Sequence, residues 1–577
     1  MEEVGHAAER DDQVIVADGV LVTSPVDVIG TATDANFFRY ELSYALAGET
    51  NFTQFATGSS QVTNGVLGRF DPTLLINDLY DIKLTVFDLA GNESSSIVTV
   101  QVARELKVGL FTITFQDLNI PLSGIPITIE RTYDSRDKDK GDFGIGWRLG
   151  IQTLRIRPNR EQGSGWVVNH SGGAFGVFSI ARVGEHKVSL TLPNGKIEEF
   201  DMVVNPSVSP LLPLQTVTAS YIPRAGTLGT LTPLDDNDLL VIGNQPGDVT
   251  LVTFAGALTY NPKRFRYITA DGTMIDIDRT KGVEKVQDRN GNTLTFGPTG
   301  IIHSSGKSVT FTRDAQNRIT QITDPAGRTQ SYAYNAAGDL ITHTDQAGNN
   351  TQFTYNSSHG LLQIIDPLNR PAIRNVYDAN GRLIAQIDAA GNRRDYVHNL
   401  AASQEVLTDR LGNTTVLEYD AVGNVTGATD ALGQRSTFTY DAQGNQLTST
   451  NPLGQTNTMT YDTKRKLLTR TDPLGNVTRF TYDPAGRLLT MVDPVGNTTA
   501  NNYDARGNLL SSTNGAGHTR NFTYDAAGNR LTARDGAGNT THFTSSAEGF
   551  LTSITDPEGT TSTATNDAMG NLLTDQH

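Results

Sequence analysis

The sequence contains no cysteine among its 577 residues. A chain without cysteine forms no disulfide bond, offers no thiolate ligands for zinc and has no thiol nucleophile. A large extracellular protein of this kind is more typical of a bacterium than of a eukaryotic secretory route, where disulfides are common.

The chain is also short of basic residues and of long apolar runs. Its 46 Lys and Arg against 62 Asp and Glu give a formal net charge of −16. That charge argues against nucleic acid and against anionic membrane surfaces, since both bind basic surfaces. No apolar run approaches the roughly 20 residues that span a bilayer. The start, MEEVGHAAERDDQVIV, has no basic segment followed by an apolar core, so an export signal is not present in this chain.

Turn-forming residues are abundant. The 56 glycines and 22 prolines, with 37% hydrophobic residues, favour many short strands over helices. A tyrosine slot recurs about every 21 residues, a period that is typical of repeat architectures. The slot is occupied by Arg313, Tyr334, Tyr355, Tyr377, His398, Tyr419, Tyr440, Tyr461, Tyr482, Tyr503, Tyr524, Ser545 and Asn566.

A second landmark, usually Asp, lies 11 residues after each slot. Gly or Asn follows both landmarks within four residues, as at Gly423 and Asn369, and these residues enter the left-handed region at low cost. The preceding Asp can bond the turn backbone. Each unit therefore contains two tight turns. The second landmarks are Asp324, Asp345, Asp366, Asp388, Asp409, Asp430, Asn451, Asp472, Asp493, Asn514, Asp535 and Asp556.

Between the turns the pattern has a period of two. Phe-Thr-Tyr phrases such as Phe438 to Tyr440 place two aromatics on one face of a strand and Thr on the other. Each unit is thus a β-hairpin whose Tyr slots stack on one buried face. On that basis we expect Tyr461→Ala to cost about 3–5 kcal/mol. About two dozen antiparallel strands must curl into a spiral or a closed shell. One extra residue between Asp366 and Tyr377, beside Pro371, predicts a bulge.

The Tyr-Asp-x-x-Gly motif over residues 301–577 resembles the YD (RHS) repeat family. This family includes bacterial Rhs proteins, the cocoon-forming subunits of insecticidal toxin complexes and the shell region of teneurins. The stretch PITIERTYDSRDKDKGDFGIGWRLG, Pro126–Gly150, is similar to the segment that opens the core of such proteins, through Thr132 to Ser135 and Phe143 to Trp147. The resemblance implies a hollow β-shell that sequesters a C-terminal effector, usually a toxin, often released by self-cleavage.

The fold class is therefore all-β, with an N-terminal Ig-like β-sandwich followed by a long antiparallel β-hairpin repeat ribbon, curled into a spiral or partial shell. We expect a disordered tail over residues 1–12 and the sandwich over residues 13–104, where short alternating strands resemble bacterial Ig-like modules. An N-terminal RHS-core β-region covers residues 105–300. About 12–13 YD/RHS units of about 21 residues cover residues 301–577. Since His577 stands where the next Asp landmark would fall, we expect the chain to be truncated at its C-terminus.

The sequence predicts no catalytic, cofactor-binding or metal site. A calcium ion needs 6–8 converging oxygens, and each turn supplies one Asp, so a turn-stabilising role is favoured for these acids. His398 stands in a Tyr slot without an evident partner. Other histidines of the repeats, among them His303, His343, His359 and His518, are scattered in turns, and the sequence has no Gly-x-Ser-x-Gly elbow.

We therefore predict a non-enzymatic, exported bacterial shell, secreted or at the cell surface, that encapsulates and helps deliver a C-terminal effector or other protein cargo. Secretion machinery and cell-surface glycans remain open as further partners; nucleic acid and a membrane span are not expected. One alternative is a cell-surface adhesin that binds carbohydrate or a neighbouring cell through the ribbon and the Ig-like module. A second is a hydrolase in residues 105–300, which would need a close acid–base pair in a cleft.

Overall fold

The computed structural model describes residues 11–14, 19–104, 108–173 and 176–576. The expected tail over residues 1–12 lies outside the described residues as far as residue 10, whereas Asp11 and Asp12 belong to the first strand. The described residues include no helix with the length and hydropathy that a membrane crossing requires. The fold is all-β, as the sequence predicts.

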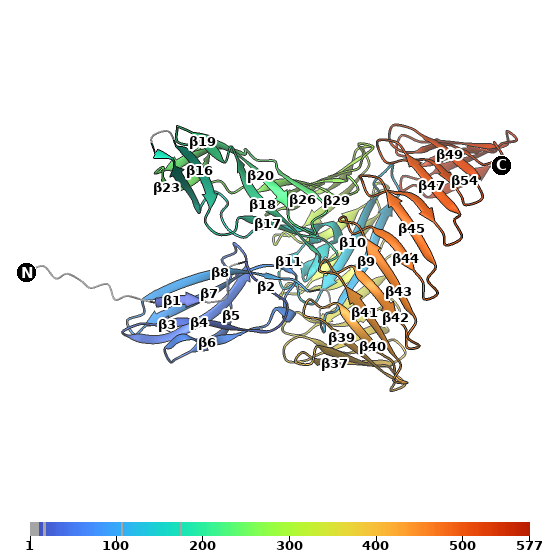
Figure 1. The fold of residues 1–577 in the computed structure, drawn as a ribbon. Coiled ribbons are helices and arrows are strands. Elements are labelled where there is room, and N and C mark those ends of the chain that lie inside the picture. The colour runs from blue at the N-terminus through green and yellow to red at the C-terminus, as the bar shows by residue number, and fades with distance from the viewer. Residues whose placement is uncertain (1–10, 15–18, 105–107, 174–175, 577) are drawn as a thin grey trace, which may run out of the picture.

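The first part of the chain is a β-sandwich. One sheet has the strand order β1-β3-β6 and the other β2-β8-β7-β4-β5 (Figure 1). Val28, Leu42, Ile82 and Val100 pack between the two sheets, because alternate residues of each strand face inward. An Ig-like origin for this sandwich stays a prediction. Its elements are β1 (Asp11–Val14), β2 (Leu21–Val22), β3 (Val26–Thr33), β4 (Phe37–Leu46), β5 (Thr53–Gly58), β6 (Val62–Phe70), η1 (Pro72–Leu74), β7 (Asp78–Asp88) and β8 (Glu93–Val102).

The sandwich is attached to the rest of the molecule by buried polar contacts. The carboxylate of Asp78 pairs with Arg155 at 3.0 Å and with Arg157 at 3.2 Å. The side chain of Asn77 donates to the carbonyl of Gly195 at 2.8 Å. Removing such partners from a buried carboxylate strongly destabilises the folded protein. The sandwich is therefore held in place on the chain that follows it.

A short segment after the sandwich, which we call the plug, lies inside the curl of the main sheet (Figure 1). Its three-stranded sheet has the order β13-β10-β9. Trp147, Tyr133 and Phe143 of the plug are fully buried in the main hydrophobic core. The plug elements are β9 (Thr112–Ile120), β10 (Ile127–Asp134), β11 (Lys140–Gly141), β12 (Gly144–Ile145), β13 (Trp147–Leu149) and η2 (Gly150–Thr153).

Beyond the plug, the described strands β14 to β54 form one sheet of 41 strands, mostly paired in chain order. Its first strands, before the regular repeats, are β14 (Arg155–Pro158), β15 (Trp166–Ser171), β16 (Val177–Arg182), β17 (Lys187–Thr191), β18 (Ile197–Asn205), β19 (Val208–Pro210), β20 (Thr216–Pro223), β21 (Thr230–Pro233), β22 (Asp238–Gly243), β23 (Gly247–Thr253), β24 (Arg264–Ile268), β25 (Met274–Asp278), β26 (Gly282–Gln287), β27 (Thr293–Gly297) and β28 (Gly300–His303).

The repeat strands continue the same sheet to the end of the described chain. They are β29 (Ser308–Arg313), β30 (Ile319–Thr323), β31 (Thr329–Tyr334), β32 (Leu340–Thr344), β33 (Asn350–Tyr355), β34 (Leu361–Ile365), β35 (Pro371–Tyr377), β36 (Leu383–Asp388), β37 (Arg393–Asn399), β38 (Gln404–Thr408), β39 (Thr414–Tyr419), β40 (Val425–Thr429), β41 (Arg435–Tyr440), β42 (Gln446–Thr450), β43 (Thr456–Tyr461), β44 (Leu467–Thr471), β45 (Val477–Tyr482), β46 (Leu488–Val492), β47 (Thr498–Tyr503), β48 (Leu509–Thr513), β49 (Thr519–Tyr524), β50 (Arg530–Arg534), β51 (Thr540–Ser545), β52 (Leu551–Thr555), β53 (Thr561–Asn566) and β54 (Leu572–Gln576).

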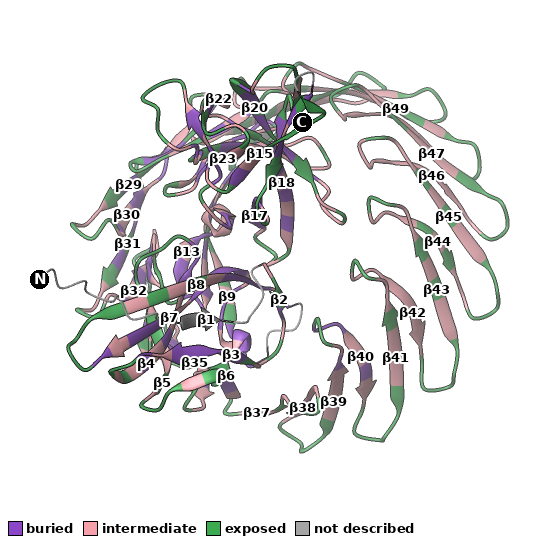
Figure 2. Cartoon of the chain, turned by 60° about the vertical axis from the view of Figure 1, so that its left-hand side comes forward, coloured by how far each residue is buried: buried purple, intermediate pink, exposed green. Residues whose placement is uncertain are grey.

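The ribbon curls, and Figure 2 shows its strands arranged as an open arc around the plug. A β-bulge recurs at the Tyr slot: Thr439 pairs with Thr448 and Tyr440 with Gln446, so Leu447 is left without a partner. A bulge bends a strand and increases its twist, and its repetition contributes to the curl. The predicted extra bulge is confirmed, since Ile364 pairs with Ile373 and Ile365 with Pro371.

Candidate functional site: the inner face of the ribbon

The inner face of the ribbon carries the aromatic residues, and the outer face carries threonine. In β29 Val309 and Phe311 are buried while Thr310 and Thr312 are exposed, which confirms the predicted period of two. On the outer face of later hairpins, pairs such as Thr439 with Thr448 share a hydroxyl hydrogen bond of 2.7 Å. The two faces therefore differ in chemistry along the whole repeat.

In most units, the residue in the Tyr slot ties its hairpin to the one before it, although Tyr419 does not make this bond. The hydroxyl of Tyr440 donates to the carbonyl of Val425 at 2.9 Å, 15 residues earlier. Arg313, His398 and Asn566 occupy the same slot and donate across the same interval. The corresponding acceptors are the carbonyls of Pro298 for Arg313, Leu383 for His398, Gln446 for Tyr461, Leu467 for Tyr482, Leu488 for Tyr503, Leu509 for Tyr524 and Leu551 for Asn566.

This donor role is the feature of the slot that sequence reasoning missed. The signal was present, because the residues that replace Tyr at these three positions all carry an N–H group at the end of the side chain. A slot that served burial alone would have accepted Leu or Phe in those units.

The acids of the repeat stabilise the turns, as predicted. One oxygen of Asp472 accepts the backbone N–H groups of Leu474 and Asn476, each at 2.9 Å, and the other accepts the Asn476 amide at 2.8 Å. The Asn476 side chain is the main cause that lowers the pKa of Asp472. Over the described ranges, no group of three His, Asp or Glu side chains could hold a metal ion.

A buried ion pair of the plug, between β10 and β9, lies against the inner face of the ribbon. Arg131 is 0% exposed and Asp117 is 3% exposed. The guanidinium donates to both carboxylate oxygens of Asp117, at 3.0 and 3.1 Å. It also lies over four aromatic rings, at 4.9–5.6 Å from their centroids, two from the plug and two from β31 and β33; these are Phe115, Trp147, Tyr332 and Phe353. Sequence reasoning did not find this pair.

The repeat side contributes further polar groups to this pair. The hydroxyl of Tyr332 donates to Asp117 at 2.9 Å, and His343 lies 3.9 Å from the same carboxylate. Burial, with Arg131 nearby, lowers the pKa of His343 to about 4. Nε2 of this neutral ring is 2.9 Å from Oε1 of Gln330 and donates to it. The network therefore fixes the position of β31 and β32 against the plug.

The histidines that the sequence brought to notice lie apart from one another. His303 contacts the carbonyl of Ser123 at 3.1 Å, and His359 contacts Asp339 at 2.7 Å. His518 is exposed in a turn. His398 takes the Tyr-slot position, as the sequence indicates, and its Nδ1 lies 3.0 Å from Oε1 of Glu405, a neighbour that the sequence did not reveal.

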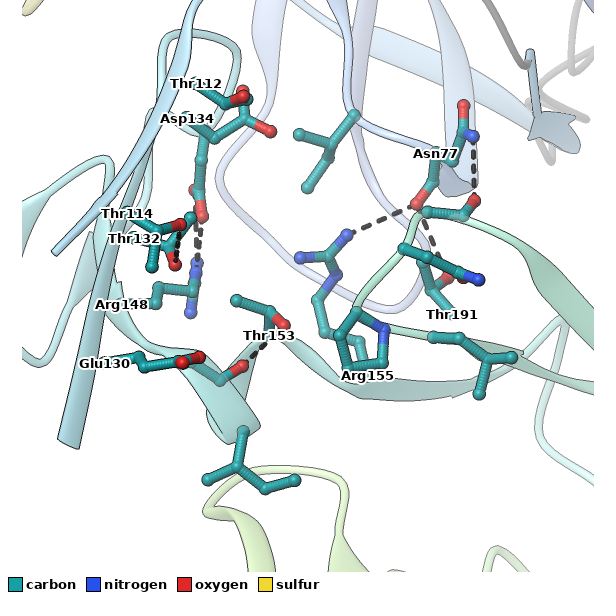
Figure 3. Close-up of a pocket in the computed structure, with 18 of the residues that line it drawn as sticks. Asn77, Thr112, Thr114, Glu130, Thr132, Asp134, Arg148, Thr153, Arg155 and Thr191 are labelled. Atoms are coloured by element: carbon teal, nitrogen blue, oxygen red, sulfur yellow. Dashed lines mark hydrogen bonds and ion pairs between the residues drawn. The ribbon is translucent and has the colours of Figure 1, made fainter. Parts of the chain in front are cut away.

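Two cavities border the plug, of about 750 and 1350 Å³. Figure 3 shows the smaller one, where Thr114 and Thr132 share a hydrogen bond of 2.9 Å and Arg155 reaches the carbonyl of Asn77. Burial raises the pKa of Asp134 in this cavity. One oxygen of Asp134 accepts the backbone N–H of Arg136 at 2.8 Å. The first and last of these bonds lie within the plug, and the Arg155 bond joins the ribbon to the sandwich, so these contacts lend no support to the hydrolase alternative.

Beyond the plug, the aromatic face continues without cover. Phe438, Met459, Phe480 and Phe522 are half-buried on this face. Figure 2 shows β41 to β47 in the colour of intermediate burial. The prediction that Tyr461 is buried is therefore wrong: its ring is half-buried, because none of the described segments forms a second layer on this part of the sheet. This uncovered inner face is the candidate functional site.

Comparison with known proteins agrees with this architecture. The sequence profile of the Teneurin YD-shell matches residues 290–396 and 392–573, and a domain of unknown function, DUF6531, matches residues 105–174. The hairpin-repeat wall thus defines a β-shell protein. The chain belongs to the YD-repeat (RHS) family, and its role is structural, as part of a shell.

Several solved structures are similar over much of the chain. The match to a crystal structure of TcdB2-TccC3-Cdc42 has 12% identity and a TM-score of 0.37, and covers 86% of this chain and 29% of that one. The match to a crystal structure of TcdB2-TccC3 has 11% identity and a TM-score of 0.32, and covers 85% of this chain and 31% of that one. The match to a Tc holotoxin pore from Photorhabdus luminescens has 11% identity and a TM-score of 0.25, and covers 87% of this chain and 35% of that one. The chain thus spans about a third of the length of these proteins. No curated protein sequence gives a significant match.

Proposed function

We propose that this chain is a non-enzymatic wall section of a secreted shell that encloses a polypeptide cargo, an effector or toxin, until delivery. The observation that carries the proposal is the half-buried aromatic face that continues past the plug, from Phe438 to Phe522. A large apolar surface that a protein leaves uncovered usually marks a binding surface.

The difference between the two faces supports this direction of binding. The inner face offers aromatic rings and Met459, which adapt to many apolar side chains. The outer face offers threonine hydroxyls that already bond one another, as at Thr481 and Thr490, 2.6 Å apart. An unfolded or partly folded cargo exposes apolar side chains, so the inner face is its natural contact.

The test uses reduced, carboxymethylated lactalbumin, a permanently unfolded chain, as the probe. We expect the full chain to bind the labelled probe in fluorescence anisotropy. Combining Phe438→Ser, Phe480→Ser and Phe522→Ser should weaken binding at least tenfold, because three inner rings are lost. The matched control combines Thr439→Ala, Thr481→Ala and Thr523→Ala on the outer face and should bind as the parent does. Equal loss in both triple variants, or no binding by the parent, would overturn the proposal.

A further inference from the structure

The uncovered inner face belongs to a stretch of the chain whose charge differs from that of the rest. Residues 435–534 contain 11 Lys and Arg against seven Asp and Glu, whereas the remaining residues contain 35 Lys and Arg against 55 Asp and Glu. The stretch is therefore basic within a chain whose formal net charge is −16. A binding surface of one charge favours a partner of the opposite charge.

The acids of this stretch all stand in its turns. Strands β41 to β50 contain six arginines and neither Asp nor Glu. The turn carboxylates are engaged within their own turns, as Asp472 is through the backbone N–H groups of Leu474 and Asn476. The sheet between the turns therefore carries positive charge that no acid of the same strands neutralises.

Three of the six arginines lie on the inner face among its apolar side chains. Arg470 of β44 lies directly opposite Met459 of β43, and residues opposite each other share a face of the sheet. Arg520 of β49 stands two residues before Phe522, which places both on the same face. The guanidinium of Arg530 lies over the Phe522 ring, 4.9 Å from its centroid. All three arginines are exposed, and over the described ranges none of them forms an ion pair.

The outer face carries the other three arginines, Arg435, Arg479 and Arg534, between its threonines. Arg435 pairs there with Glu418, and Arg534 donates to the carbonyl of Gly538 at 3.3 Å. The two faces thus have equal formal charge but different surroundings. Exposed arginine stands beside aromatic rings on the inner face and beside hydroxyl groups on the outer face. A ligand that needs both positive charge and apolar contact therefore finds them on the inner face.

This combination fits an acidic polypeptide segment better than a nucleic acid. Aromatic rings with arginine also bind single strands, but a strand has a phosphate at every nucleotide and needs a continuous basic track. Arg470 and Arg520 are five strands apart, about 24 Å at about 4.8 Å per strand. Strands β45 to β48 between them carry no Lys or Arg on the inner face. Scattered carboxylates among apolar side chains match this spacing, since an extended segment of about seven residues spans it.

We propose that the uncovered inner face selects acidic cargo: the segment bound there carries Asp or Glu among apolar side chains, and these carboxylates pair with Arg470, Arg520 and Arg530. This preference rests on the proposed function and adds to it the charge of the cargo. Charge complementarity decides the preference, because apolar contact alone does not distinguish an acidic from a basic segment. The guanidinium groups pair with carboxylates while the rings cover the apolar side chains between them.

Three labelled peptides of equal length and equal Phe and Leu content test the preference, with Glu, Gln or Lys at all other positions. In fluorescence anisotropy with the full chain at about 50 mM salt, we expect the Glu peptide to bind about tenfold more tightly than the Gln peptide. The Lys peptide should bind most weakly. An exposed ion pair contributes at most about fivefold, so the preference requires at least two of the arginines. At about 500 mM salt the preference should fall below about threefold, because salt screens exposed charges.

Paired substitutions separate direct contact from overall charge. Arg470→Ser combined with Arg520→Ser should reduce the preference for the Glu peptide to less than about threefold, because two contacts are lost. Arg479→Ser combined with Arg534→Ser is the matched control. It removes the same charge from the outer face of the same stretch and should leave the preference at about tenfold. All four side chains are exposed, so neither double variant should have a lower melting temperature.

The outcomes distinguish the charge preference from the apolar contact. Equal binding of the three peptides would overturn the preference and leave the proposed function standing. If none of the peptides binds, the proposed function fails and the preference with it. An outer double variant that loses as much preference as the inner one would mean that the charge of the whole stretch acts, and not contact on the inner face. Tighter binding of oligothymidylate than of the Glu peptide would overturn the proposal in favour of a nucleic-acid surface.

Discussion

Two stretches of the same ribbon have the same hairpins and different cores. In the covered section, residues 308–388, the plug packs on the inner face, and Phe353 is 2% exposed. In the open section, residues 435–534, the equivalent Phe480 is half-buried. The Tyr-slot bond is nevertheless the same in both, since Tyr355 donates to Leu340 at 2.8 Å and Tyr482 to Leu467 at 2.9 Å.

The difference separates the hydrogen bonding of a repeat hairpin, which the ribbon itself provides, from the burial of its apolar side chains. In the covered and open sections, the backbone, the turn acid and the Tyr hydroxyl find partners within the ribbon, as at Tyr355 and Tyr482, so their hydrogen bonding does not depend on what covers the sheet. Burial of the apolar side chains requires a second layer, which the plug supplies in the covered section alone. The open section therefore has its hydrogen bonds satisfied while its apolar side chains are incompletely buried, which fits the proposed binding of a cargo on this face.

The largest effect should come from breaking the buried ion pair of the plug that faces the ribbon. Asp117→Ala leaves Arg131 buried without its counter-ion, and we expect a loss of about 3–5 kcal/mol in the free energy of unfolding. The control is Glu418→Ala near the open section, whose partner Arg435 is exposed; that variant should lose less than about 1 kcal/mol. Urea denaturation measures both. Equal losses would mean that the buried pair of the plug contributes no more to stability than the exposed pair.

Truncating equivalent aromatics compares the two sections directly. Phe353→Ala removes a ring whose centroid lies 5.4 Å from that of Trp147 and 6.0 Å from that of Phe115. We expect the variant to lose about 3–5 kcal/mol in the free energy of unfolding. Phe480→Ala, at the same repeat position, should cost about 1–2 kcal/mol because its ring is already in contact with water. If the second loss matched the first in urea denaturation, the open section would have a cover that the structure does not show.

Acid should weaken the covered section through His343. Burial holds its pKa at about 4 in the folded chain, against 6.5 for a free histidine. Because the folded pKa is lowered, the contribution of the neutral ring is complete above about pH 6.5 and is lost as the pH falls towards 4, by up to about 3 kcal/mol. Gln330, Asp117 and Arg131 face this ring.

The His343→Gln variant measures this contribution. Its urea midpoint should fall less than that of the parent between about pH 7 and about pH 4.5. His518→Gln, in an exposed turn, should follow the parent. Parallel curves for all three proteins would show that His343 is hydrated in solution.

The repeat was predictable because its chemistry is local. A turn acid such as Asp472 and its glycine lie within four residues of each other, so their spacing survives in the sequence. The period of two in each strand, and the extra residue near Pro371, are local in the same sense. Family resemblance added the expectation of a shell, and the matching profile confirms the family.

The contacts of the plug were not predictable, because they join residues far apart that share no pattern. Arg131 meets Tyr332 and Phe353 across about 200 residues, and a lone Arg in a strand gives no sign of being buried. For the same reason the burial of Tyr461 was overestimated: the repeat predicts which face turns inward, but not whether anything covers it.

The smallest expected effect tests whether the Tyr hydroxyl contributes equally to stability in the covered and the open section. Tyr461→Phe removes one hydrogen bond to the Gln446 carbonyl, 2.9 Å long, and should cost about 0.5–1.5 kcal/mol. Tyr461→Ala should cost about 1–3 kcal/mol, below the sequence-based expectation, because the ring is half-buried. Tyr355→Phe should cost about 1–3 kcal/mol, since the indole N–H of Trp147 also donates to this hydroxyl at 2.8 Å and would be left unpaired. The excess of Tyr355→Phe over Tyr461→Phe in urea denaturation therefore reports the plug contact alone. An excess of zero would mean that Trp147 finds water there, and that the covered section is less closely packed than the distances indicate.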